Sequence, residues 1–78
     1  MIDYQTLKNS YIGAIQMGLD LGFPDPKQGN ELLHKFCENC VDNSNYSEQD
    51  KHDMKLDLDL LKEALSQEIE NHTRGAQQ

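Results

Sequence analysis

The fold of this chain is decided by the stretch SEQDKHDMKLDLDLLKEALSQEIENH, residues 47–72. Its apolar residues recur at steps of four, three, four and four, which is the spacing of one face of an amphipathic helix. These residues are Met54, Leu58, Leu61, Leu65 and Ile69. Residues 55–60 also alternate charged residues with leucine, as a strand would, but the residues that follow are helix formers without β-branches. We therefore predict a helix over residues 48–72, with Ser47 as its N-cap.

A first, shorter helix is predicted over residues 3–21. Asp3 is suited to the N-cap, and Gly22 is suited to the position just after the last helical residue. The apolar stripe of this helix consists of Tyr4, Leu7, Tyr11, Ile15 and Leu19. Gly13 and Gly18 lie near the stripe and lower helix propensity, so we expect a neighbouring helix to approach closely there.

A second helix is predicted over residues 26–41. Asp25 followed by Pro26 has the order of an N-cap and a first helical residue. We expect five residues of this helix to face the core: Leu33, Phe36, Cys37, Cys40 and Val41.

These patterns predict an all-α fold, a small three-helix bundle. The chain has 78 residues, which suffices for a single domain over residues 1–72, with residues 73–78 as a disordered tail. Leu56 and Leu60 form a second apolar row beside the main stripe of the third helix. Either the two shorter helices flank both rows, or a second copy of the chain covers one of them, which would make a homodimer through the C-terminal helix.

The chain is strongly acidic, with 14 acidic against 7 basic residues and a net charge of −7. This balance argues against direct binding of nucleic acid, which requires clustered Lys and Arg. No segment approaches the roughly 20 apolar residues that span a bilayer. Residues 1–3 lack the basic and apolar regions that open a signal peptide, so we expect a cytoplasmic protein that does not bind membranes.

The acidic residues of the third helix suggest a docking surface. The candidate contacts are Asp50, Asp53, Asp57, Asp59 and Glu63. The favoured function is a protein–protein interaction module, a regulator or inhibitor that docks on a basic site of a partner, such as a nucleic-acid-binding site. Accessory proteins of phages and mobile elements are similar in size, charge and helicity. The alternative is that these carboxylates only keep the protein soluble.

A second hypothesis is a small zinc-binding domain. His34, Cys37 and Cys40 have H-x2-C-x2-C spacing, and on a helix each lies about 60° from the next. His52 or Asp53 would be the nearest candidates for a fourth ligand. The alternative is that both cysteines are buried free thiols. No combination of nucleophile and base resembles a catalytic set, so we expect neither an enzyme nor a cofactor.

Overall fold

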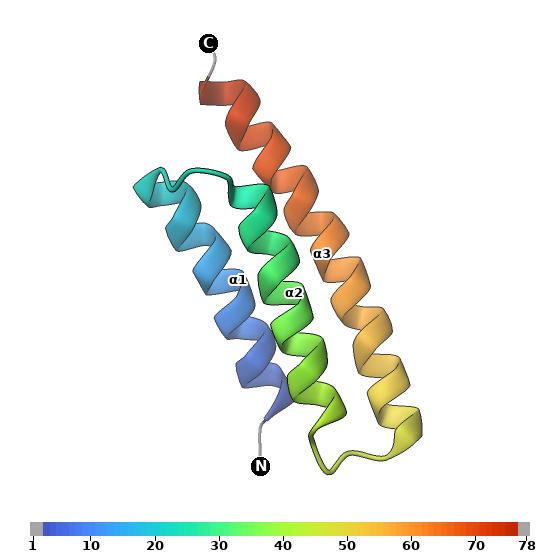
Figure 1. Ribbon diagram of the computed structural model, residues 1–78. Coiled ribbons are helices and arrows are strands. Elements are labelled where there is room, and N and C mark those ends of the chain that lie inside the picture. Colours follow the sequence, from blue (N-terminus) through green and yellow to red (C-terminus); the bar gives the residue numbers. More distant parts are fainter. Residues whose placement is uncertain (1–2, 77–78) are drawn as a thin grey trace.

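The computed structural model describes residues 3–76, and three helices account for most of them. They are α1 (Tyr4–Leu21), α2 (Pro26–Asp42) and α3 (Glu48–Ala76). Successive helices run in opposite directions, and α2 lies between α1 and α3 in Figure 1. Residues 3–76 contain no strand, and the alternating segment 55–60 is helical. The predicted all-α three-helix fold is therefore confirmed.

The molecule is elongated because α3 is much longer than its neighbours. At about 1.5 Å per residue, the 29 residues of α3 extend about 43 Å, close to the 47 Å length of the molecule. The last turns of α3 project beyond the α1–α2 connection (Figure 1). Within residues 3–76, every helix is too short or too polar to cross a lipid bilayer.

The three helix starts and the end of α1 lie where the capping residues predict. The Asp3 side chain accepts a hydrogen bond from Thr6 N at 3.1 Å, and the Asp25 side chain accepts one from Gln28 N at 3.2 Å. Ser47 Oγ accepts from Asp50 N at 3.1 Å. Gly22 ends α1 with a φ of 71°, which a residue with a side chain adopts at a cost.

One core joins the three helices. The main stripe of α3 contributes Leu58, Leu65 and Ile69 as buried residues, with Met54 and Leu61 partly buried beside them. The stripe of α1 contributes Tyr11, Ile15 and Leu19 as buried residues, with Tyr4 and Leu7 partly buried. The predicted stripes of both helices are confirmed. The predicted domain also includes Met1 and Ile2, which lie outside the described residues.

The inward face of α2 differs from the prediction in two of its five residues. Phe36 is 59% exposed and Cys40 is only partly buried, whereas Cys37 and Val41 belong to the core. The buried residues of α2 are spaced by four, three and four positions: Asn30, His34, Cys37 and Val41. Two of them are polar. A search for apolar residues alone therefore assigns the buried face of α2 incorrectly and includes Phe36.

The expected close approach at Gly13 and Gly18 is wrong. A Cβ atom at Gly13 would have no neighbouring atom within 4 Å, and one at Gly18 would meet only the Phe23 ring, at 3.6 Å. Both glycines therefore lie outside the tight helix contacts. The space at Gly18 belongs to a surface groove that is described below.

The end of α3 also differs from the prediction. Residues 73–76 continue the helix instead of starting a tail, and Gln77 and Gln78 lie outside the described residues. Thr73 Oγ1 donates a hydrogen bond to the Ile69 carbonyl at 2.9 Å, and the Arg74 guanidinium lies 3.6 Å from the Glu70 carboxylate. These contacts at i,i+4 spacing support the last turn.

The second apolar row of α3 is not covered by α1 and α2. Leu60 is 71% exposed and Leu56 is 51% exposed. The first of the two sequence-based alternatives, in which the shorter helices flank both rows, is therefore wrong. Coverage of this row by a second copy stays a prediction.

Candidate functional site

Asp57, one of the five predicted docking residues, is partly buried and contacts α1. The Tyr4 hydroxyl donates a hydrogen bond to Asp57 Oδ2 at 2.6 Å, and Lys8 Nζ lies 3.0 Å from the same oxygen. The hydrogen bonds from Tyr4 and Lys8 lower the pKa of Asp57. Burial, followed by the hydrogen bond to Asp57, raises the pKa of Tyr4. Asp57 therefore links α3 to α1.

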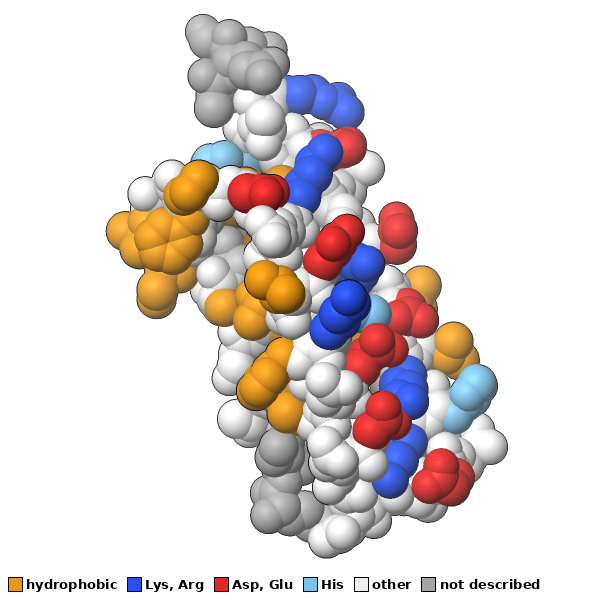
Figure 2. All heavy atoms as spheres, viewed as in Figure 1, with side chains coloured by type: hydrophobic (Ala, Val, Ile, Leu, Met, Phe, Trp, Pro, Cys, Tyr) orange, Lys and Arg blue, Asp and Glu red, His pale blue; other side chains and the backbone are white. Residues whose placement is uncertain are grey.

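The other four acidic residues do not share one face. Asp59 contacts His34 on α2, whereas Asp50, Asp53 and Glu63 are exposed. Asp57 contacts α1 and Asp59 contacts α2, because two residues at i,i+2 spacing lie on nearly opposite sides of a helix. On the face seen in Figure 2, acidic and basic side chains alternate along α2 and α3. The structure thus divides the predicted docking set into two groups: Asp57 and Asp59 contact neighbouring helices and, within residues 3–76, Asp50, Asp53 and Glu63 do not.

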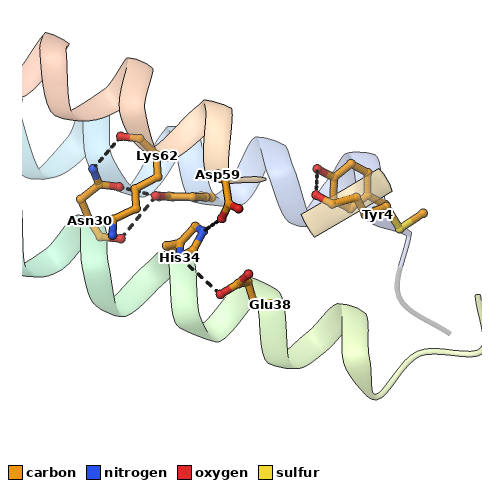
Figure 3. A network of polar contacts seen from close by, with 8 residues as sticks. Tyr4, Asn30, His34, Glu38, Asp59 and Lys62 are labelled. Carbon is orange, nitrogen blue, oxygen red and sulfur yellow. Dashed lines mark hydrogen bonds and ion pairs between the residues drawn. The ribbon is translucent and has the colours of Figure 1, made fainter. Parts of the chain in front are cut away.

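His34 lies between two carboxylates at the α2–α3 contact (Figure 3). Its Nε2 lies 2.7 Å from Asp59 Oδ1, and its Nδ1 lies 3.5 Å from Glu38 Oε1. Within residues 3–76, these three side chains form the one group of possible metal ligands whose atoms all lie within 4.8 Å of one another. His34 therefore has metal-binding neighbours, but they are carboxylates and not Cys37 and Cys40.

Asn30 connects all three helices in the interior. Its Oδ1 accepts a hydrogen bond from the Tyr11 hydroxyl, and its Nδ2 donates to the Lys62 carbonyl at 3.1 Å (Figure 3). The same Nδ2 also donates to Ser66 Oγ at 3.0 Å. Asn30 is 1% exposed. Burial raises the pKa of Tyr11 to about 12, so this hydroxyl stays a donor. The network is structural, since it is closed to solvent.

Both cysteines are free thiols, and they differ in exposure. Cys37 belongs to the core and Cys40 is partly exposed. Burial, with a smaller contribution from Cys40, raises the pKa of Cys37 to about 11. A thiol with so high a pKa is a poor nucleophile at neutral pH.

An apolar groove runs between α1 and α2, beside their connection. Its volume is about 250 Å³. The lining residues are Ala14, Ile15, Gly18, Phe23, Pro24, Asp25, Pro26, Gly29 and Leu33. The groove exists because Ala14, Gly18 and Gly29 have little or no side chain, and a Cβ atom at Gly29 would have no neighbour within 4 Å.

Exposed hydrophobic side chains extend the groove at both ends. Leu21 continues the α1 face of Ala14 and Gly18, and Phe36 continues the α2 face of Gly29 and Leu33, in both cases at helical spacing. Phe36, Leu21 and Phe23 are all more than half exposed. Figure 2 shows hydrophobic side chains gathered at the end of α1 and the connection that follows it. We call the groove formed by the lining residues, which Leu21 and Phe36 extend, the α1–α2 groove.

Sequence reasoning missed the groove, Asn30 and Glu38. Asn30 lies at helical spacing from His34, Cys37 and Val41, so the period of the core face could have identified it. Glu38 follows His34 by four residues, which places both on one helical face. The groove had no comparable signal because it depends on how α1 and α2 pack.

Comparisons of this chain with models of known protein families, with curated proteins and with solved structures found no match. The candidate sites are therefore interpreted from their geometry and chemistry alone.

Proposed function

We propose that this protein is a protein–protein interaction module whose α1–α2 groove accepts a large apolar side chain from a basic segment of a partner. The observation that carries the proposal is the groove itself, with Leu21, Phe23 and Phe36 exposed around it. Exposed apolar surface of this kind is typical of binding sites, because water leaves it when a partner docks.

Charge supports a basic partner. Asp25 is the one charged residue among those that line the groove, and the whole chain has a net charge of −7. A partner segment with Lys or Arg beside its apolar anchor would be attracted to this end of the molecule and would meet Asp25 on docking. The exposed carboxylates of Asp50, Asp53 and Glu63 add to the net negative charge of the chain.

The role that we propose for this binding is to regulate or inhibit the partner. A small acidic domain with one apolar docking groove can cover a basic site, such as a nucleic-acid-binding site, without any chemistry of its own. This chain is similar in size, charge and helicity to accessory proteins of phages and mobile elements. The support that this similarity gives to a regulatory role is an analogy only.

The proposal is tested by filling the groove. Ala14→Phe places a ring in the groove, and Ala64→Phe makes the same change at an exposed position of α3. Each variant would be used as bait in cells that naturally produce the protein, and the retained proteins would be quantified by mass spectrometry. We expect a partner that wild type and Ala64→Phe retain and Ala14→Phe loses. Equal retention by all three baits would contradict the proposal.

The charge contribution has a separate test. The triple variant Asp50→Asn, Asp53→Asn, Glu63→Gln leaves Asp57 and Asp59 in their internal contacts. We expect it to bind the partner more slowly at low salt, where exposed charges act over about 30 Å, and at the wild-type rate at physiological salt, so that its dependence on salt is weaker. An unchanged salt dependence would show that these carboxylates only keep the protein soluble.

A further inference from the structure

We propose that His34, Glu38 and Asp59 bind one divalent transition-metal ion, with Zn²⁺ as the best fit. The site would join α2 to α3 near the middle of the bundle, and it is independent of the α1–α2 groove. Each side chain would supply one ligand atom, and water would complete the coordination.

The distances are compatible with a shared ion. Two ligands on one tetrahedral zinc lie about 3.3 Å apart, given bonds of about 2.0–2.2 Å. His34 Nδ1 and Glu38 Oε1 are 3.5 Å apart, and all three ligand atoms lie within 4.8 Å of one another. Asp59 would have to give up its 2.7 Å contact with His34 Nε2 and reach the Nδ1 side of the ring, and its side chain, 58% exposed, has solvent on one side in which to move.

The burial of the three groups suits a site that ions can enter. His34 is 8% exposed, so its ring is held in one place, whereas the carboxylates of Glu38 and Asp59 are open to solvent on one side. The two carboxylates together carry a charge of about −2, which a divalent cation balances. Imidazole with carboxylates is a ligand set that Zn²⁺ accepts.

The same contacts have a simpler explanation, in which the three side chains form only a hydrogen-bonded bridge between the helices. The cysteine-based site predicted from the sequence is the other alternative. Metal titration distinguishes the three possibilities, because each makes a different set of residues necessary for binding.

The experiment uses the full chain without an affinity tag, first stripped with a chelator. Zn²⁺ is titrated by calorimetry, and the melting temperature is measured by circular dichroism with and without Zn²⁺. The test variants are Glu38→Gln and Asp59→Asn, whose side chains are exposed enough for the fold to tolerate the change. Glu63→Gln is the charge-matched control on α3, and the double variant His52→Asn, His72→Asn removes the two exposed histidines.

We expect one Zn²⁺ per chain and a higher melting temperature in its presence. Glu38→Gln and Asp59→Asn should each weaken binding by at least about tenfold, while both controls should bind as wild type does. Bound Co²⁺ should show visible ligand-field bands without the near-ultraviolet thiolate band of cysteine ligation. Absence of binding, loss of binding in the His52, His72 variant, unchanged binding in Glu38→Gln and Asp59→Asn, or a thiolate band would each overturn the proposal.

Discussion

The hydroxyl of Tyr4, in the first turn of α1, donates a 2.6 Å hydrogen bond to the carboxylate of Asp57 in the middle of α3. The same hydroxyl lies 3.3 Å from the Met54 carbonyl. These two contacts hold the start of α1 against the long helix. They also show that Asp57, which looks like a surface carboxylate in the sequence, has partners within the fold.

The energetic coupling of Tyr4 and Asp57 can be measured by a double-mutant cycle. Tyr4→Phe and Asp57→Asn should each lower the free energy of unfolding, and the coupling between them should be about 1 kcal/mol, since the pair is partly exposed. Urea unfolding followed by circular dichroism gives all four values. Strict additivity of the two changes would show that the hydrogen bond contributes nothing to stability.

Acid should destabilise the protein partly through Asp57. Its pKa is lower in the folded protein than in the unfolded chain, so the unfolded chain takes up the proton first as the pH falls. The stabilisation is therefore fully present above the unfolded pKa and is lost as the pH falls through the folded pKa. We expect stability to fall less steeply with acid in Asp57→Asn than in wild type. Asp53→Asn, an exposed control, should follow wild type.

The buried Asn30 should be the most sensitive polar position in the chain. Asn30→Ala removes the side-chain partner of the Tyr11 and Ser66 hydroxyls and leaves Tyr11 only the carbonyl of residue 30, which should cost about 2 kcal/mol of unfolding free energy. Asn39→Ala changes the same residue type at an exposed position of α2 and should stay within about 0.5 kcal/mol of wild type. Similar losses in the two variants would contradict the role of the network.

The two thiols should react at very different rates. Burial keeps Cys37 protonated and out of reach, whereas Cys40 is partly exposed. In the folded protein at neutral pH, we expect a thiol reagent to label Cys40 at least about tenfold faster than Cys37, with the two rates converging in denaturant. Mass spectrometry of the digested protein separates the two sites. Equal labelling of both thiols without denaturant would show that Cys37 is not in the core.

Much of the fold could be predicted from the sequence, because its signals are local. The cap at Ser47, the glycine at 22 and the proline at 26 each act within one helical turn, and the structure has helix ends at all three. The stripes of α1 and α3 consist of apolar residues only, so periodicity found them. The buried stripe of α2 includes the polar residues Asn30 and His34, which have partners in the core. A search for apolar residues alone leaves these two out and includes the exposed Phe36 instead.

The candidate sites could be predicted only in part, because they depend on which helices meet. His34 was identified as a possible ligand, but its carboxylate neighbour Asp59 is 25 residues away and comes close only when α2 packs on α3. The α1–α2 groove forms because Ala14, Gly18 and Gly29 have small side chains or none. No periodic pattern in the sequence predicts such a groove. Local patterns therefore predict elements well and predict contacts between elements poorly.

The most direct test of the proposed function is a photo-cross-linking amino acid placed in turn at Phe23, in the groove, and at Leu60, on the exposed row of α3. The protein would be irradiated in cells that naturally produce it, and the cross-linked products would be identified by mass spectrometry. We predict that position 23 joins the chain to a basic segment of another protein, and that position 60 yields at most a second copy of this chain. Cross-links to the same partner at equal yield from both positions, or to a partner from position 60 alone, would contradict docking through the groove.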